Sequence, residues 1–193
     1  FSVSEIPPVH AIYRHTTFDK VWPKIPKEGK IVVRIGSHAD FTEELTDAID
    51  AFCATYDAVV CCDHTSGYRG KYEVQGQLVF CQKQWSSPLS TANLCIHIGE
   101  VSGDQFTINT NHSWRVSPDG ALRDTFGNLR RVFMMPEVTF FRHYSQENAS
   151  HREYFESLNE EIKKLEAKIP DLPFSNIWMA QQMVGKLPDH SEL

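Results

Sequence analysis

KIVVRIGSH, residues 30–38, is the stretch that decides the fold of this chain. Its apolar run ends at Gly36, and the pattern of an amphipathic helix follows. Asp40 can cap that helix, and Glu43 stands three residues later, as in a capping box. The apolar residues that then share one helical face are Phe41, Leu45, Ala48, Ile49 and Phe52. A buried strand that passes into such a helix is typical of α/β folds.

Strand patterns recur on both sides of this unit. We expect them at 10–16, 57–63, 93–99, 112–120 and 130–136, while 74–82 is too short for periodicity to separate helix from strand. Pro136 and Glu137 open a further short helix through Phe141. Near-continuous apolar strands separated by helices indicate a parallel sheet covered on both faces. We therefore predict a three-layer αβα fold with roughly six parallel strands.

The composition changes after Tyr144, which suggests three segments. Residues 1–144 form the predicted central α/β domain, and 145–171 a polar linker with an amphipathic helix. Ser150 and Glu153 make a capping-box pattern at the start of that helix. Residues 172–193 contain another helix, capped by Ser175, whose apolar side chains have nothing after them to pack on. We interpret it as the first helix of a further, cofactor-binding domain, and the start at Phe1 as that of a processed or excised piece.

Composition limits the function classes. The 193 residues carry a formal net charge of −6 without strong clusters of Lys and Arg, which argues against nucleic acid as a partner. No apolar run is long enough for a membrane span, and no signal peptide opens the chain. The five cysteines include no C-x-x-C, and adjacent Cys61 and Cys62 point to opposite faces of a strand, so they favour reduced thiols in the cytoplasm over a metal site with Asp63 and His64.

Ligands of parallel sheets bind outside the carboxyl ends of the strands, so three loops are candidates: 36–41, 63–72 and 99–106. The second, DHTSGYRGKY, offers His64, Arg69 and Lys71 as cationic or acid–base groups and two tyrosines, Tyr68 and Tyr72, as stacking surface. The alternative is a surface loop that contacts another subunit or domain. The motifs G-x-G-x-x-G, Walker A and G-x-S-x-G are absent, and mid-strand His97 is expected to be a hydrogen-bonded core histidine.

Several of these stretches resemble the central region of thiamine-diphosphate-dependent enzymes. Within these enzymes, the chain resembles the menaquinone-pathway family of 2-succinyl-5-enolpyruvyl-6-hydroxy-3-cyclohexene-1-carboxylate synthases, or a paralogous branch. The stretches that carry it are IPPVHAIYRHT, IGSHADF, DAVVCCDHTSGYRGKY, LCIHIGEVSGD, SWRVSPDGALRDTFGNLRRVFMMPE and LPFSNIWMAQ. They extend over nearly the whole chain but include no single diagnostic motif.

The resemblance implies three α/β domains, of which this chain matches the Rossmann-like middle one. In such enzymes the first domain holds the aminopyrimidine and the activating glutamate, and the last binds the diphosphate through Mg²⁺ with a Gly-Asp-Gly motif and a downstream Asn. Pro118-Asp119-Gly120 with Asn148 imitates this motif, but the first glycine is missing. We therefore expect thiamine diphosphate and Mg²⁺ in the parent enzyme, and no cofactor, metal or catalytic residue in this chain.

The family's loop after the matching strand has Thr/Ser-Gly followed by a Lys-Arg pair that reaches the carboxylates of the oxoacid and the acceptor. This sequence keeps Ser102 and Gly103 but continues with Asp104 and Gln105. Carboxylates near Asp104 would be repelled unless another cation, such as Arg69 or Lys71, intervened. The change puts 2-oxoglutarate and isochorismate in doubt as substrates and favours a less anionic acceptor. We expect these loop residues, with His64, to face the substrate or a domain interface.

The prediction is a non-catalytic central domain of a thiamine-diphosphate-dependent 2-oxoacid decarboxylase or carboligase, a transferase or lyase. The parent is expected to be a cytoplasmic homo-oligomer, a dimer or tetramer, in which this domain contacts the pyrimidine- and diphosphate-binding domains and neither nucleic acid nor membrane. One alternative is a nucleotide- or effector-binding regulatory module that uses the crevice near Gly36, Thr65 and Gly99. Another is a scaffold that only holds the cofactor domains together.

Overall fold

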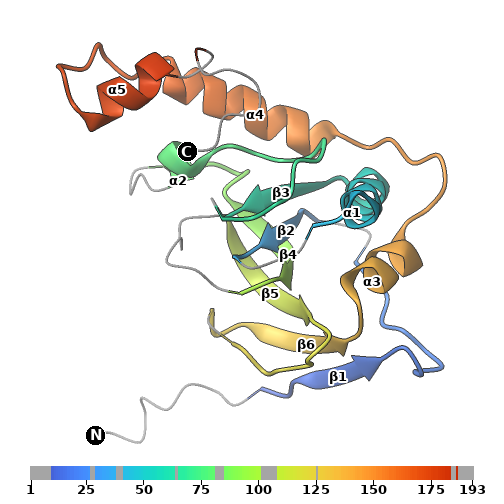
Figure 1. Cartoon of the computed structure of the whole chain (residues 1–193). Coiled ribbons are helices and arrows are strands. Elements are labelled where there is room, and N and C mark those ends of the chain that lie inside the picture. The colour runs from blue at the N-terminus through green and yellow to red at the C-terminus, as the bar shows by residue number, and fades with distance from the viewer. Residues whose placement is uncertain are drawn as a thin grey trace, which may run out of the picture.

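The computed structural model describes residues 10–26, 29–37, 41–63, 65–80, 85–100, 108–124, 126–183 and 186. Six strands form one sheet in the order β1-β6-β5-β4-β2-β3, and every neighbouring pair is parallel. This confirms the predicted parallel α/β fold (Figure 1). The strands are β1 (Tyr13–Thr16), β2 (Ile31–Ile35), β3 (Ala58–Cys62), β4 (Thr91–Ile98), β5 (Asn109–Val116) and β6 (Leu129–Met134).

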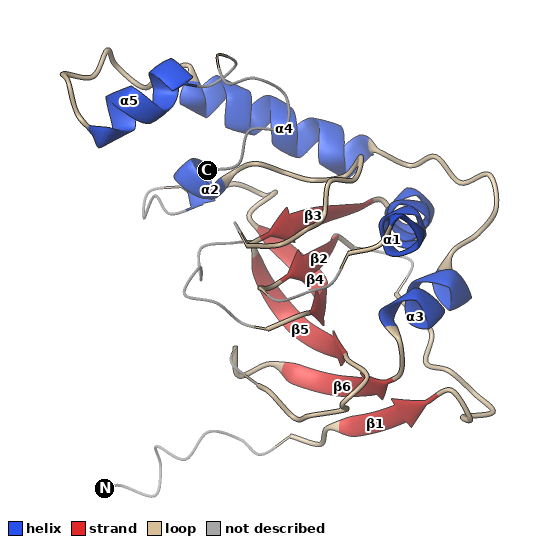
Figure 2. Ribbon diagram, in the orientation of Figure 1, coloured by secondary structure: helices blue, strands red, loops and turns tan. Residues whose placement is uncertain are grey.

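Helices lie on both faces of the sheet (Figure 2). On one face, α1 (Glu43–Tyr56) and α3 (Glu137–Tyr144) cover a core that runs across the sheet from Val60 to Phe133. On the other, α2 (Gln77–Phe80) and α4 (Glu153–Glu166) cover a smaller core. That second core draws its strand residues from β2, β3 and β4: Val32, Val59, Cys61, Ala92 and Cys95. The second helical layer thus lies over one half of the sheet.

The other half of the second face is formed by β5 and β6. The connection between these strands contains no helix in its described parts, residues 117–124 and 126–128. Asp119 holds its first turn together, because the carboxylate accepts hydrogen bonds from the Ser117 hydroxyl at 2.5 Å and the Ala121 amide at 2.9 Å. In the described parts of this connection, a loop therefore takes the place that a helix has in the β2–β3 and β3–β4 crossovers.

Helix α1 begins two residues later than its capping pattern predicts. Thr42, rather than Asp40, is the N-cap, and its hydroxyl accepts the Leu45 amide at 3.2 Å. A threonine at this position satisfies one of the free amides of the first turn. Asp40 lies outside the described residues. The predicted apolar face is confirmed, since Leu45, Ala48, Ile49 and Phe52 are buried and Phe41 packs against them.

Helix α4 also starts differently from its predicted capping box. Its N-cap position is Arg152, and no side chain of the cap residue bonds the first turn. The acceptor comes instead from Asp57, whose carboxylate oxygens lie 2.9 and 3.0 Å from the Tyr154 amide nitrogen. Sequence-local capping was wrong here because a residue far along the chain supplies the oxygen. The helix buries Tyr154, Leu158 and Ile162 in the second core.

Helix α5 (Asn176–Met183) follows α4 after Pro170 and has no buried residue. The predicted cap is confirmed, because the Ser175 hydroxyl accepts the Trp178 amide at 3.2 Å. The ambiguous segment 74–82 contains α2, a single helical turn. None of the helices among the described residues is long and apolar enough to cross a membrane.

Candidate functional site: the carboxyl ends of β2, β4 and β5

The order in which successive strands join the sheet reverses between β2 and β4. After β2 the chain adds β3 on one side, and after β3 it returns to place β4 on the other side of β2. In open α/β sheets such a switch point opens a crevice at the carboxyl ends of the strands, where ligands bind. Gly36 and Gly99 follow β2 and β4 at this edge, so two of the loops singled out in the sequence meet here.

In the described part of the two loops, backbone fills this crevice. The Gly36 amide donates to the Ile98 carbonyl at 2.9 Å, and the Glu100 amide donates to the Ser37 carbonyl at the same distance. Ser37 and Glu100 also form an antiparallel bridge. A Cβ on Gly36 would overlap the carbonyl oxygen of Glu100, so only glycine allows the two chains to approach this closely. Among the described residues, main chain thus closes the space between the loops after β2 and β4.

Beside the closed crevice, a row of basic side chains crosses the sheet. Arg34 on β2 pairs in register with His97 on β4, and His97 pairs with Arg115 on β5. Residues in register point to the same face, and this face is the one opposite α1 and α3, since the alternate residues Val33, Ile96 and Trp114 belong to the first core. We call these three residues the basic row. Arg115 is 1% exposed and His97 is 4% exposed.

Arg115 ties the row to the loop after β4. Its Nη1 donates to the Gly99 carbonyl at 2.8 Å and lies 3.3 Å from His97 Nδ1, while its Nη2 lies 3.4 Å from Glu100 Oε1. Arg123, from the β5–β6 connection, forms an ion pair with the other oxygen of Glu100. Within the described part of the chain, Arg115 and Arg123 are the cations that contact the start of this loop, at Gly99 and Glu100.

Electrostatics keep His97 neutral. Burial lowers its pKa from 6.5 to about 3, and the positive charges of Arg115, Arg34 and Arg123 act in the same direction. Burial also lowers the pKa of the Arg115 guanidinium, although the carboxylates of Asp119 and Glu137 oppose the shift. His97 is thus a buried core histidine, as its place in the strand predicts, and it offers hydrogen bonds rather than charge.

The predicted site residues fall into two groups. His64, Ser102, Gly103, Asp104 and Gln105 lie outside the described residues. Arg69 and Lys71 are described and exposed.

Arg69 donates to the carbonyls of Ser66 at 3.2 Å and Tyr68 at 2.7 Å, and so braces its own loop. The tyrosines of this loop were expected to offer stacking surface, and that expectation was wrong. Tyr68 is fully buried, with its hydroxyl 2.6 Å from Asp50 Oδ1, and Tyr72 is 4% exposed.

Sequence reasoning missed Arg34, Arg115 and Arg123. A signal was present for the first two, since each is a single charge between two apolar residues, in IVVRI and in SWRV. A charged residue at such a position is almost never fully buried unless it is paired. The imitation of a cofactor motif at Asp119 is explained by its turn, because the carboxylate is used by Ser117, Ala121 and Arg123.

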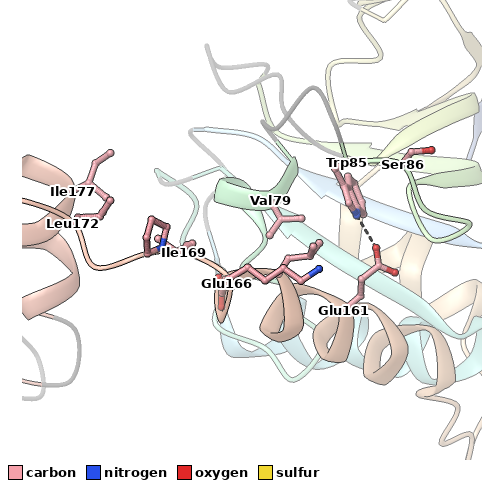
Figure 3. Close-up of a pocket in the computed structure, with 11 residues that line it drawn as sticks. Val79, Trp85, Ser86, Glu161, Glu166, Ile169, Leu172 and Ile177 are labelled. Carbon is pink, nitrogen blue, oxygen red and sulfur yellow. Dashed lines mark hydrogen bonds between the residues drawn. The ribbon is translucent and has the colours of Figure 1, made fainter.

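A second concave feature lies away from the switch point, between α4, α5 and the segment at Trp85 (Figure 3). Its volume is about 680 Å³, and Val79, Leu165, Ile169 and Ile177 give it an apolar lining. Glu161 closes one side, because it accepts the Trp85 indole N–H at 2.7 Å and the Ser87 hydroxyl at 2.7 Å. Both of its carboxylate oxygens are engaged, so this groove offers apolar surface more than reactive groups.

Two comparisons with known proteins give no family for the chain. No family model matches it, and no curated protein is significantly similar to it. Among the described residues, no group of three or more His, Cys, Asp and Glu side chains could hold a metal ion.

Proposed function

We propose that the chain is the non-catalytic central domain of a thiamine-diphosphate-dependent 2-oxoacid decarboxylase or carboligase, from a branch similar to the menaquinone-pathway synthases. The observation that carries the proposal is the closed switch point at Gly36 and Gly99. A Rossmann-like sheet whose nucleotide crevice is filled by its own backbone suits a structural role between other domains. The same observation disfavours the alternative of a nucleotide-binding regulatory module.

The exposed helix α5, which follows the α/β fold, supports the proposal. Helix α4 packs on the sheet, whereas α5 and the residue before its cap present Phe174, Ile177, Met179 and Met183 to solvent with exposed fractions of 81, 56, 45 and 39%. Apolar side chains gathered on one short helix mark a surface that another body covers. In the proposed parent enzyme that body is the diphosphate-binding domain, of which α5 is the first helix.

The proposed division of labour assigns the chemistry to other domains. Thiamine diphosphate, held with Mg²⁺ outside this chain, supplies the carbanion chemistry that removes CO₂ from a 2-oxoacid. This chain contributes the edge at the carboxyl ends of β2 and β4. Asp104 and Gln105 stand where the synthases have a Lys-Arg pair, so the acceptor is less anionic than isochorismate.

The setting of the parent enzyme belongs to the same proposal. We place it in the cytoplasm as a homo-oligomer, with the flanking cofactor domains as partners of this chain. Three of the described cysteines support a reducing compartment: Cys53, Cys62 and Cys95 are free thiols, and burial raises the pKa of Cys53 and Cys95. Buried thiols of this kind are unreactive and need no disulfide partner.

The test is CO₂ release by a full-length parent that contains these residues, with thiamine diphosphate, Mg²⁺ and either 2-oxoglutarate or pyruvate. Release that depends on the cofactor supports the proposal, and turnover of pyruvate in preference to 2-oxoglutarate supports the paralogue. In calorimetric titrations, the parent should bind thiamine diphosphate and the 193-residue chain should not. A parent that neither binds the cofactor nor releases CO₂ from any 2-oxoacid would show the assignment to be wrong.

A further inference from the structure

The concave feature between α4, α5 and Trp85 has the form of a small-molecule site. We call it the α4–α5 pocket. Figure 3 shows Val79 and Trp85 on one side of it and Leu172 and Ile177 on the other. Its volume of about 680 Å³ lies within the range of about 300–1,000 Å³ that such sites occupy. The proposed function makes no use of this pocket.

The wall formed by Val79, Trp85 and Leu165 is held in place by the second core. Val79 is a buried member of that core, and Trp85 and Leu165 pack against it. The Trp85 ring lies 5.0 Å from the Phe80 ring between centroids, and its N–H donates to Glu161 at 2.7 Å. The indole is therefore fixed on the core side and gives the pocket a firm aromatic surface.

The opposite wall has no such support. Helix α5 has no buried residue, and its Ile177 lines the pocket while it is 56% exposed. A molecule held between the two walls covers apolar surface on both, and each Å² removed from water contributes about 25 cal/mol. A partner that covers only the outside of α5 leaves this inner space unfilled. The pocket therefore suits a small molecule with an apolar body.

Glu161 gives the pocket a negative charge. Its carboxylate accepts one hydrogen bond from the Trp85 indole and one from the Ser87 hydroxyl, both at 2.7 Å. Both donors are neutral, so they orient the carboxylate without balancing its charge. Within the described part of the chain, no cation lies at ion-pair distance from this carboxylate.

The C-terminal end of α4 adds to this charge. Leu165 and Glu166, the last two residues of the helix, line the pocket, and so does Ile169 after it. The last carbonyls of a helix carry a partial negative charge, and Glu166 contributes a second carboxylate. Lys168 opposes them as the one cation among the described lining residues. The balance of charge favours a positively charged ligand.

We propose that the α4–α5 pocket binds a small organic cation, an ammonium group on an aromatic or branched aliphatic body. The body lies between the two walls against the Trp85 indole, and the ammonium group lies toward Glu161 and Glu166. Tryptophan is the side chain whose ring attracts cations most strongly, and nearby carboxylates add to that attraction. This assignment goes beyond the proposed function and does not depend on it.

The experiment titrates the 193-residue chain with three probes that share one phenethyl body and differ in charge: phenethylammonium, phenethyl alcohol and 3-phenylpropanoate. Sodium chloride keeps the ionic strength constant, because salt screens the charges at the rim. The readout is the ¹H–¹⁵N NMR signal of the Trp85 indole. The indole of Trp114, which is 6% exposed in the first core, is the internal reference.

We expect phenethylammonium to shift the Trp85 signal saturably, with a dissociation constant on the order of 1 mM or tighter. Phenethyl alcohol should bind about threefold more weakly, since it keeps the apolar contacts and loses the attraction of the cation to the indole and the carboxylates. The anion 3-phenylpropanoate should bind most weakly of the three. The Trp114 signal should stay in place throughout.

Three variants make the test specific. Glu161→Gln keeps an acceptor for the Trp85 indole but loses the charge, so it should weaken phenethylammonium more than phenethyl alcohol. Lys168→Gln should strengthen phenethylammonium. Lys164→Gln is its matched control, because Lys164 is a 75% exposed lysine of α4 that pairs with Glu160 and does not line the pocket.

Two results would overturn the proposal. One is the lack of a saturable Trp85 shift with phenethylammonium, and the other is binding of phenethyl alcohol or 3-phenylpropanoate as tightly as the cation. If Glu161→Gln does not fold, the order of the three probes on the natural chain still decides the question. CO₂ release by the parent plays no part in this readout, so either proposal can fail alone.

Discussion

Asp57 joins the two helical layers through a single side chain. It ends α1 in the left-handed conformation, with φ and ψ both 49°, and its carboxylate accepts the backbone amide of Tyr154 in the first turn of α4, 97 residues further along the chain. The amides of the first helical turn have no partner within their own helix, so this carboxylate supplies one. The position of α4 over the second core therefore depends on where α1 stops.

We expect Asp57→Ala to lower the free energy of unfolding by about 2 kcal/mol. Loss of a helix-capping acceptor costs about 1 kcal/mol, and a left-handed residue other than Gly, Asn or Asp costs about 1 kcal/mol more. Asp57→Asn keeps an acceptor oxygen and tolerates the conformation, so it should lose less than about half as much. Urea denaturation measures both, with the exposed Asp47→Ala on α1 as the control. Equal losses for the Ala and Asn variants would contradict the dual role.

The closed switch point predicts an unusually sensitive glycine. Gly36→Ala places a methyl group against the Glu100 carbonyl, which is main chain and cannot rotate away. We expect a loss of more than about 3 kcal/mol of stability, or a chain that does not fold, since overpacking that moves backbone is costly. Gly127→Ala is the control because its Cβ meets no atom within 4 Å and only its positive φ opposes the change.

For Gly127→Ala the expected loss is about 1 kcal/mol, the cost of an alanine in the left-handed region. Thermal unfolding of the two variants separates a steric clash from a conformational penalty. If Gly36→Ala were as mild as Gly127→Ala, the β2 and β4 loops would not be in contact, and the crevice would be open to a ligand after all.

The parallel sheet could be predicted because its strands are apolar enough to be recognised one at a time. KIVVRIG and NLCIHIG have the near-continuous hydrophobicity of strands buried on both faces, and helix patterns separate them from their neighbours. The strand order could not be predicted in the same way. It depends on which side of β2 the returning chain joins, and that choice is made by the packing of whole helices.

The basic row was missed for the same reason. Arg34, His97 and Arg115 are 63 and 18 residues apart along the chain, and they become neighbours only when β4 lies between β2 and β5. Local patterns also misplaced the start of α4, where the acceptor for the first turn comes from Asp57 rather than from Ser150. Patterns between near neighbours in the sequence predict individual helices and strands. Contacts across the sheet can be predicted only when the order and pairing register of the strands are known.

The exposed face of α5 should be neutral in this chain and important in a longer protein. Phe174→Ser and Ile177→Ser alter side chains that are 81 and 56% exposed, so each should change the unfolding free energy of the 193-residue chain by less than about 0.5 kcal/mol. In the proposed parent enzyme the same changes should lower the melting temperature by several degrees, since burial of a large apolar side chain contributes about 2 kcal/mol. Equal, small effects in both proteins would indicate that nothing covers α5.

His97 gives the fold a defined response to acid. The unfolded chain takes up a proton on this ring near the ordinary pKa of 6.5, whereas the folded chain resists protonation until about 3, because the ring is buried beside Arg115, Arg34 and Arg123. Between these values the unfolded state binds more protons, so acid favours unfolding. The contribution of His97 is therefore constant above about pH 6.5 and falls by up to about 1.4 kcal/mol per pH unit below it. Urea unfolding of the natural chain and of His97→Gln should diverge in slope only in that range.

Two comparisons make this prediction specific to the ring. The same series in a Glu100→Gln background removes the carboxylate that contacts Arg115, and the difference between chains with and without the His97→Gln substitution should persist. His151→Gln, which removes an imidazole that is 60% exposed, serves as the control for a surface histidine. If the natural chain and His97→Gln lost stability in parallel as the pH fell, the His97 ring would not resist protonation in the folded chain.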